Sequence, residues 1–302
     1  MRTMPNAVAA WALDPITDRQ YTLLRQLIYR EAGINLGPAK RELLVGRLSR
    51  RLRQLGLTSF GDYYEYVTAP GGVEELTQLL DHIATNETHF FREPAHFDFI
   101  ERQLCPAWRA AAEAGARPRT VRAWSAACST GEEPYSLAML LLSLLPAESG
   151  WSVDILATDI STRVLRRAEA AVWPSEKARQ IPTPYLKRFM LRGVGTQEGR
   201  MKAAPALRSA VQFRHLNLNH EQYAVGAPFD IIFCRNVLIY FDSPTKADVV
   251  RRLTEHLAPR GHLVLGHSES IHGMTTPLRS VGPTVYALGA ARVTGRVPKV
   301  AS

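Results

Sequence analysis

A turn of small residues followed by two glutamates is the first pattern in this sequence that could serve chemistry. The segment CSTGEEP (128–134) comes directly after a predicted strand. Small residues let the backbone approach a ligand closely, and the N–H groups at the start of the next helix can face that ligand. Glu132 and Glu133 would repel a phosphate there but attract an ammonium group. Alternatively, both glutamates only stabilise the helix dipole, and the motif taken alone favours this second interpretation.

Polar side chains also stand at the ends of three later strands. Asp159 ends the strand VDILATD (153–159), where an acidic residue accepts hydrogen bonds from ribose hydroxyls in nucleoside-binding α/β folds. Capping of the following helix explains this residue equally well. The other two strand ends carry amide groups suited to an adenine edge, at Asn217-Leu218-Asn219 and Arg235-Asn236.

Together, these groups describe a cavity for S-adenosylmethionine, with an ammonium acceptor, a ribose acceptor and amides near an adenine. CSTGEEP does not match the GxGxxG fingerprint of dinucleotide binding, and the chain contains no GxxxxGK[ST] phosphate loop. The pattern therefore favours S-adenosylmethionine over NAD and ATP.

The segment TNETHFFRE (85–93) places three polar side chains, Asn86, Thr88 and Arg92, beside the apolar pair Phe90-Phe91. A core helix does not need these polar groups, and a solvated loop does not need both rings. The segment lies between a helical region and an α/β region, so its rings can pack in the domain interface while its polar side chains face a ligand. We predict that it closes over the cofactor as one half of a split site.

The elements that position these residues fall into two regions. Residues 17–95 predict a helical N-terminal domain, because leucines and isoleucines recur at helical spacing and Gly33 and Gly56 are placed to end helices. A linker helix over 96–118 leads to an α/β domain over 119–289. Strands alternate with helices in that domain, which predicts a parallel, doubly wound sheet that binds its ligand at the carboxyl ends of the strands.

Four further segments complete the expected organisation. The interruption between the second and third strands is too long for a simple loop, so we expect a small inserted β-subdomain over about 174–210. KADVVRRLTEHLAPRG (246–261) predicts an amphipathic helix ended by Gly261. Residues 1–16 are expected to be a flexible N-terminus, and the polar residues 290–302 a disordered tail.

Composition limits the class of protein. The 302 residues are 46% hydrophobic and 22% charged, as in ordinary globular proteins. No apolar run reaches the roughly 18 residues that span a bilayer, and the N-terminus lacks a secretory signal. Three separated cysteines without CxxC spacing argue against a disulfide framework and fit a reducing cytoplasm. The net charge of +9 indicates an acidic partner, whether nucleic acid, anionic membrane or protein, unless it reflects only a basic proteome.

Five ordered segments carry a resemblance to a known family. TNETHFFRE, WSAACSTGEEPYSLAM, ATDIS, FCRNVLIYFD and GHSES, read in this order, resemble the chemotaxis receptor methyltransferases, the CheR family, over about residues 20–290. The resemblance implies an N-terminal helical domain and a Rossmann-like S-adenosylmethionine-dependent methyltransferase domain with a small inserted β-subdomain. It also implies methyl transfer from S-adenosylmethionine to glutamate carboxylates of chemoreceptor signalling helices, which yields methyl esters for sensory adaptation (EC 2.1.1.80) and S-adenosylhomocysteine.

The same resemblance implies which residues hold the cofactor. The contacts from the linker side come from Asn86, Thr88 and Arg92. The methionine amino group meets Glu132, with Glu133 as the second choice. The ribose and the adenine with its neighbouring parts are held by Asp159, Asn217, Leu218, Asn236 and Val237.

The chemistry agrees with this inventory. Methyl transfer to a carboxylate is an in-line displacement from a sulfonium, and a glutamate nucleophile is already ionised at neutral pH. No strong general base is required, so catalysis would come mainly from positioning. By the resemblance, Tyr240 matches a tyrosine near the methyl-transfer centre, and Arg109 is the nearest candidate for a basic residue that the family places there.

Three alternatives have weaker support. His267-x-Glu269-x-x-His272 lacks the i, i+4 histidine pair of a helical metal site, so we expect no metal. A nucleic-acid methyltransferase would suit the basic charge, but the chain has no DPPY-like tetrapeptide and no basic stretch interleaved with aromatic residues. A module that only senses S-adenosylmethionine would not need Tyr240.

Partners follow from charge and from the resemblance. The basic helix over 40–53 is expected to steer the acidic helical domain of a chemoreceptor, although it could simply be a solvated face. The inserted subdomain is where the family docks a receptor's C-terminal tether peptide, by β-augmentation of an edge strand. We expect a cytoplasmic monomer, recruited to membrane receptor arrays, that is not embedded in the membrane and binds no nucleic acid.

Overall fold

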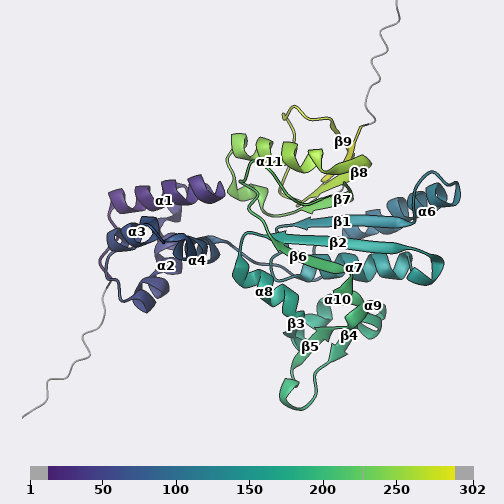
Figure 1. Ribbon diagram of the computed structural model, residues 1–302, viewed down its shortest axis with the longest axis horizontal. Helices are drawn as coiled ribbons and strands as arrows, with labels where there is room; N and C mark the ends of the chain where they lie inside the picture. Colours follow the sequence, from purple (N-terminus) through teal and green to yellow (C-terminus); the bar gives the residue numbers. More distant parts are fainter. Residues whose placement is uncertain (1–12, 227, 290–302) are drawn as a thin grey trace, which may run out of the picture.

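Four helices form the N-terminal domain in the structure, a computed structural model that describes residues 13–226 and 228–289 (Figure 1). Their bounds are α1 Asp18–Ala32, α2 Arg41–Leu55, α3 Phe60–Thr68 and α4 Val73–Ile83. A capping box at Thr17 begins α1, and two glycines with left-handed backbone, Gly33 and Gly56, end α1 and α2. The apolar faces of the helices enclose a core that includes Leu24 and Leu48.

The segment just before α1 packs on this domain. Ile16 is buried in the core of the helices. Residues 13–16 therefore pack on the helices, although we expected a flexible segment over 1–16, because scattered apolar side chains without helical or strand spacing do not reveal where they pack. Residues 1–12 and the expected disordered tail 290–302 lie outside the described residues.

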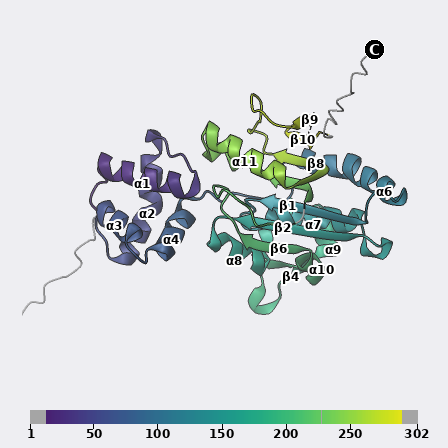
Figure 2. The same cartoon turned by 45° about the horizontal axis from the view of Figure 1, so that its top comes forward.

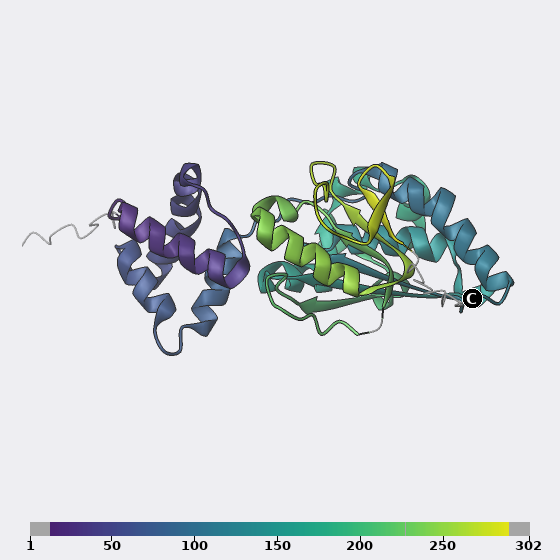
Figure 3. The same cartoon turned by 90° about the horizontal axis from the view of Figure 1, so that it is seen from above.

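A helical run follows the interdomain segment. It consists of α5 Pro94–Phe99, a π-helical turn η2 Ile100–Leu104 and α6 Cys105–Glu113. Its apolar side chains, among them Ile100 and Trp108, are buried in the core of the α/β domain. The helix that we expected as a linker over 96–118 thus belongs to the α/β domain, and the segment 84–93 makes the connection between the two lobes (Figure 3).

A seven-stranded sheet forms the centre of the α/β domain, with the order β6-β2-β1-β7-β8-β10-β9 among the described residues. The strands are β1 Thr120–Ala126, β2 Ser152–Asp159, β6 Val211–His215, β7 Phe229–Cys234, β8 Leu257–Leu265, β9 Leu278–Gly282 and β10 Val285–Leu288. The first five strands in this order are parallel, whereas β10 is antiparallel to β8 and to β9. The prediction of a parallel sheet is wrong at this edge, because the short Pro283-Thr284 connection allows only a hairpin.

Helices cover both faces of the sheet (Figures 1 and 2). α11 Ser243–Glu255 lies on one face, and α7 Glu132–Leu144 and α8 Thr162–Ala170 lie on the other. Side chains alternate along β7, so Ile231 and Phe233 join the core with α7, while Ile232 and Cys234 join the core with α11. Burial on both faces explains why the strand reads as a continuous apolar run.

The helix α11 ends at Glu255, earlier than the sequence led us to expect. Pro259 cannot continue helical hydrogen bonding, and β8 has already begun at Leu257. Gly261 therefore does not end a helix. It lies within β8, where a Cβ atom would meet the carbonyl oxygen of Phe229 at 2.9 Å.

A second, smaller sheet forms the inserted subdomain. It contains β3 Val172–Pro174, β4 Met190–Arg192 and β5 Arg200–Ala203 in the antiparallel order β3-β5-β4. The accompanying helices are η4 Ser175–Gln180, α9 Thr183–Phe189 and α10 Pro205–Ser209. Trp173 and Phe189 from this subdomain join the same core as α7, so the insert is packed onto the α/β domain (Figure 1).

Side chains after β6 hold the end of α1 and thereby join the two domains. The amide Nδ2 of Asn217 donates to the carbonyl of Glu31 at 2.6 Å, and Nδ2 of Asn219 donates to that of Arg30 at 3.0 Å. Gly33 follows with φ +70°, and a Cβ atom there would lie 2.9 Å from Oδ1 of Asn219. The interface therefore requires a residue without a side chain at this position.

We expect Gly33→Ala to destabilise the protein more than Gly56→Ala. Both glycines have nearly the same left-handed backbone, which costs alanine about 1–2 kcal/mol. Open space surrounds Gly56, whereas Gly33 faces Asn219, so overpacking should add about 1 kcal/mol or more. Chemical unfolding of both variants measures the difference, and equal free energies of unfolding would contradict the close contact at Gly33.

Candidate active site

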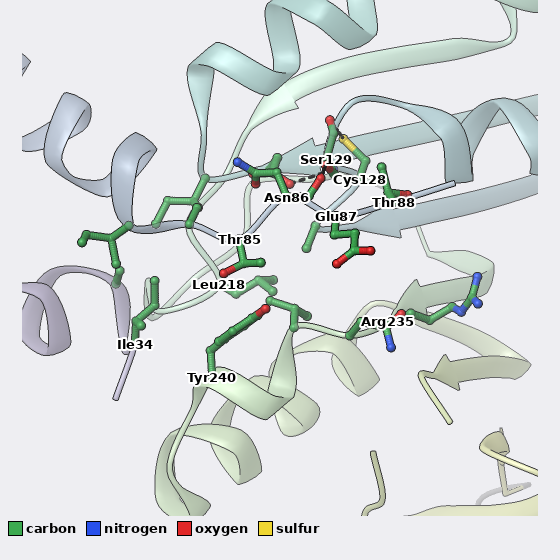
Figure 4. Close-up of a pocket in the computed structure, with 18 of the residues that line it drawn as sticks. Ile34, Thr85, Asn86, Glu87, Thr88, Cys128, Ser129, Leu218, Arg235 and Tyr240 are labelled. Carbon is green, nitrogen blue, oxygen red and sulfur yellow. Dashed lines mark hydrogen bonds between the residues drawn. The ribbon is translucent and has the colours of Figure 1, made fainter. Parts of the chain in front are cut away.

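The carboxyl ends of the central strands open onto a pocket between the two domains. Parallel strands bring their carboxyl ends to one edge of a sheet, so loops that are far apart in the sequence meet there. In Figure 4 the interdomain residues Thr85–Thr88 lie between Ser129 on one side and Leu218 and Tyr240 on the other. The lining combines residues of the helical domain (Ala32, Ile34, Leu36, Lys40, Leu43, Arg47, Ile83), the interdomain segment (84–89 and Arg92) and the strand ends (127–129, Glu133, 159–160, 216–218, 235–237, Tyr240, Phe241).

Most of the residues that we expected at the site line this pocket. They are Asn86, Thr88, Arg92, Asp159, Asn217, Leu218, Asn236, Val237 and Tyr240. Two do not belong to the lining, Glu132 and Arg109, and each has a different role in the fold.

Glu133, and not Glu132, faces the pocket. Consecutive residues of a helix point in directions about 100° apart, so only one of the two glutamates can face the ligand. Oε1 of Glu133 accepts from the Ser125 hydroxyl at 2.7 Å, and Oε2 pairs with Nη1 of Arg235 at 3.1 Å. The Glu132 side chain is fully buried beside the pocket and pairs with Lys177. Sequence alone could not separate the neighbours, because helix phase depends on where α7 begins.

Arg109 lies far from the pocket, which corrects its expected place near the methyl-transfer centre. Its guanidinium donates to the carbonyl of Leu144, at the C-terminal end of α7. The pocket lies at the other end of that helix, which is about 20 Å away for a helix of this length. The basic residues that do line the pocket are Lys40, Arg47, Arg92 and Arg235.

A buried ion group holds Glu133 and the interdomain segment together. The Arg235 side chain is only 1% exposed, and its Nη2 contacts Oε2 of Glu93 at 3.0 Å and the carbonyl of Arg92 at 2.5 Å. Burial raises the pKa of Glu133, and Arg235 opposes the rise. Burial also acts to raise the pKa of Glu93, but Arg235 and the N–H of His267 outweigh it and hold that pKa below its usual range. Arg235 is thus shared between two carboxylates.

Backbone N–H groups fix the carboxylate of Asp159. Its Oδ2 accepts from the N–H of Ser129 at 2.8 Å, and its Oδ1 accepts from that of Ser161 at 2.9 Å. Burial raises the pKa of Asp159, and these two donors act against the increase. The side chain that caps α8 is Ser161, whose Oγ accepts from the N–H of Val164. Helix capping therefore does not account for Asp159.

The interdomain segment turns its two kinds of side chain in opposite directions. Phe90 is buried against Trp173, with ring centroids 5.1 Å apart, and Phe91 stacks on Tyr185 at 5.4 Å. Both rings therefore pack on the α/β domain and its insert, and not between the two domains as we expected. The polar residues of the same segment line the pocket. Residues 84–89 line the pocket, and the backbone then turns at Phe91, whose φ of 51° is left-handed.

Glu269 holds the turn that carries Asn236 and Tyr240. Its carboxylate accepts from the backbone N–H groups of Asn236 at 2.8 Å, Leu238 at 2.7 Å and Gly266 at 2.7 Å. Asn236 has a left-handed φ of 59°, a conformation that amides tolerate better than most side chains. Tyr240 follows in the short helix η6 Leu238–Tyr240 and lines the pocket beside the helical domain (Figure 4).

The contribution of the helical domain to the pocket was missed from the sequence. Lys40 lies 5.7 Å from the centre of the Tyr240 ring, and Arg47 donates to the carbonyl of Ile83 and to Oγ1 of Thr85 at 2.8 Å. Burial lowers the pKa of the Arg47 guanidinium. These residues belong to the basic run that we assigned to a partner. Only the docking of one domain on the other could show that part of this run faces inward.

One group of side chains has spacing that a metal ion could use. Among the described residues, ligand atoms of Glu93, His96 and His267 lie within 4.8 Å of one another. Glu93 already pairs with the Arg235 guanidinium, which repels a cation. In the neighbouring motif His267-x-Glu269-x-x-His272, the carboxylate of Glu269 already accepts hydrogen bonds from backbone N–H groups. We therefore assign no metal to this group.

Comparison with known proteins identifies the family and its two domains. Residues 19–84 match the family model described as CheR methyltransferase, all-alpha domain, and residues 86–287 match CheR methyltransferase, SAM binding domain. "Chemotaxis protein methyltransferase 2" of Pseudomonas aeruginosa is 41% identical over 275 residues, which cover 90% of this chain and 93% of that protein. "Chemotaxis protein methyltransferase" of Escherichia coli strain K12 is 40% identical over 274 residues, which cover 90% and 92%.

The helical domain and the α/β domain are those of an S-adenosylmethionine-dependent methyltransferase. The chain belongs to the CheR methyltransferase family, the chemotaxis protein methyltransferases. The prediction of this family and of its fold class is thereby confirmed. In the described part of the chain, no helix has the length and apolar character to cross a bilayer.

We expect the buried His96 to make stability depend on pH. Burial lowers its pKa to about 4, with a further decrease from Arg235, whereas an unfolded histidine titrates near 6.5. Between these values the unfolded chain binds more protons, so this contribution to stability is present above about pH 6.5 and is lost as the pH falls toward 4. The slope for one group reaches at most about 1.4 kcal/mol per pH unit.

Unfolding free energies at pH 7, 6, 5 and 4.5 measure this slope. His96→Gln keeps a polar group near Thr284 but cannot gain the charge, so its slope should be smaller than that of the wild-type protein. The control is His272→Gln, which changes an exposed histidine. If His96→Gln and the wild-type protein show the same pH dependence, the buried neutral histidine is not its source.

Proposed function

We propose that this enzyme transfers the methyl group of S-adenosylmethionine to glutamate side chains of chemoreceptor signalling helices and forms glutamate methyl esters (EC 2.1.1.80). The observation that carries the proposal is the pocket between the domains, where acceptors for a cofactor and a tyrosine lie beside basic residues of the helical domain. Membership in the family supports the same reaction. We further propose that the enzyme acts in the cytoplasm as a monomer recruited to receptor arrays.

The donor set of the pocket fits the cofactor. Glu133 offers a carboxylate to the methionine amino group. Ser125 and Arg235 contact its Oε1 and Oε2 and thereby fix the orientation of the carboxylate. Asp159 offers a fixed carboxylate to the ribose hydroxyls. The amide of Asn217 donates to the helical domain, so Leu218 and Val237 are left to pack on the adenine, with the backbone of the strand ends beside them. Asn86, Thr88 and Arg92 cover the cofactor from the interdomain segment.

Bound S-adenosylmethionine supplies an electrophilic methyl group on a sulfonium. The residues of the chain have to bring a glutamate carboxylate into line with it and exclude water. The Tyr240 hydroxyl can donate to one carboxylate oxygen and leave the other free to attack. Lys40 and Arg92 lie in the same pocket and attract the negative charge. No side chain has to remove a proton, because a glutamate is already ionised near neutral pH.

The exposed basic residues of the run 40–53 form the proposed receptor surface. Arg41 pairs with Asp18, and Arg51 pairs with Glu75 at 2.5 Å, both within the helical domain. Arg47 turns inward and donates to Thr85 of the interdomain segment. The exposed cations of the run are Lys40, Arg50 and Arg53. They lie on the domain that borders the pocket, where an acidic receptor helix can approach Tyr240.

The edge of the small sheet offers a second receptor contact. β4 is an edge strand in the order β3-β5-β4. Leu191 within it is 52% exposed, and Val194 just after it is 79% exposed. An extended peptide can pair with such an edge and place alternate side chains on it. We propose that a receptor's C-terminal tether docks there.

A filter assay with methyl-labelled S-adenosylmethionine tests the reaction. It offers the enzyme receptor-rich membranes, tRNA and DNA in parallel. The proposed function requires label on a receptor protein that mild base releases, because methyl esters are base-labile. Label only on nucleic acid, or base-stable label on protein, would overturn it.

We expect Asp159→Asn to weaken the binding of S-adenosylhomocysteine by roughly 10- to 100-fold, since hydrogen bonds to a charged acceptor contribute about 1.5–3 kcal/mol. Isothermal titration calorimetry measures the affinity. The matched control is Asp154→Asn on the same strand, whose partly exposed carboxylate pairs with Arg122 at 3.1 Å outside the pocket. Unchanged affinity in Asp159→Asn would remove Asp159 from the ribose site.

We expect Arg50→Glu combined with Arg53→Glu to lower kcat/KM for receptor methylation by about tenfold or more at low salt, because charge reversal repels an acidic helix. The affinity for S-adenosylhomocysteine should not change. Arg251→Glu on α11 reverses an exposed charge of another surface and serves as the control. Methylation rates at two salt concentrations measure the effect, and equal rates in all three proteins would rule out this surface.

A further inference from the structure

One fully buried acid has no part in the proposed chemistry. The Glu132 side chain has no exposed surface, yet it does not line the pocket. Its Oε2 accepts from the Thr130 hydroxyl at 2.7 Å, and its Oε1 pairs with the ammonium group of Lys177. A buried carboxylate needs such a partner, because an unpaired charge in the interior is strongly destabilising.

Lys177 connects three segments that are distant in the sequence. It belongs to η4 of the inserted subdomain and reaches Glu132 in the first turn of α7. The same ammonium group lies 3.4 Å from the carbonyl oxygen of Thr88, in the interdomain segment. An ammonium group has three hydrogen-bond donors and can serve both acceptors at once. The segment that covers the pocket is thereby tied to the insert.

A second contact from η4 holds the same segment. Oε1 of Gln180 accepts from the backbone N–H of Phe90 at 3.1 Å. Trp173, just before η4, packs edge-on against the Phe90 ring and donates its Nε1–H to the carbonyl of Thr130 at 3.2 Å. The backbone is therefore held on both sides of His89 by side chains of the insert.

We propose that Lys177 and Gln180 are positioning residues for cofactor binding, which hold the backbone over Thr88–Phe90 so that Thr88 faces the cofactor. The inference rests on the proposed function in one respect, namely that the pocket binds S-adenosylmethionine. The inserted subdomain then has a role in the cofactor site that is separate from any docking of a receptor peptide.

This arrangement affects binding of the cofactor more than the chemical step. A segment that is no longer held in its closed conformation covers both the ground state and the transition state less well. Loss of such uniform binding raises KM for S-adenosylmethionine and leaves kcat nearly unchanged. If the ion pair only stabilised the fold, its loss would lower the thermal stability but would not raise KM for S-adenosylmethionine at constant kcat.

Four variants of the 302-residue protein test the proposal. Lys177→Met leaves the Glu132 carboxylate buried without its partner, so its Tm should fall. Lys177→Met combined with Glu132→Gln removes both charges and should recover the Tm, yet S-adenosylhomocysteine should still bind about tenfold more weakly than to the wild-type protein. Gln180→Ala should weaken binding about three- to tenfold at a nearly unchanged Tm. Lys187→Met, an exposed lysine of the same subdomain, is the matched control.

We would measure the affinity of each variant by calorimetry, its melting temperature, and its kcat and KM separately. A double variant with wild-type Tm and wild-type affinity would show that Lys177 only neutralises Glu132, and the proposal would fall. The same conclusion follows if kcat falls while KM for S-adenosylmethionine stays constant. If the wild-type protein itself does not bind S-adenosylhomocysteine, the proposed function fails, which is a different outcome from equal binding by wild-type and variant.

Discussion

The buried guanidinium of Arg235 is the interaction on which the pocket depends. It joins Glu133 on α7, Glu93 and the Arg92 carbonyl in the interdomain segment, and its side chain is only 1% exposed. Two carboxylates share one cation, so removal of Arg235 leaves two largely buried carboxylates without that partner. A single residue at the end of β7 therefore fixes both the acceptor proposed for the methionine amino group and the segment that covers the pocket.

Hydrogen bonds fix the conformation of the loops that form the pocket. Backbone N–H groups surround the carboxylates of Asp159 and Glu269 and fix the turns after β2 and β7. The insert holds the interdomain segment from one side, and Ser129 holds it from the other through its hydroxyl, which donates to the Asn86 carbonyl at 3.0 Å. A methyl transfer that needs alignment more than acid–base chemistry gains from this rigidity.

Local patterns in the sequence predicted several features correctly. Gly33 and Gly56 end helices with a left-handed backbone, and a small antiparallel sheet forms the expected insert. Asp159 and Asn236 lie in the pocket lining, and their contact with a cofactor stays a prediction. The errors arose where the outcome depends on phase or on distant partners. The choice between Glu132 and Glu133 depends on the phase of α7, and the edge hairpin β9–β10 depends on pairing with β8.

The sequence by itself determined the family, the two-domain α/β class and the strand ends that carry polar groups, because these follow from local periodicity and short ordered motifs. Tertiary structure alone decided which side of each segment faces the pocket. Phe90 and Phe91 pack on the α/β domain and its insert. Arg47 of the helical domain points inward, whereas Arg109 lies at the far end of α7. The physical reason is that burial of a charge or a ring depends on partners contributed by remote parts of the chain, which no local pattern specifies.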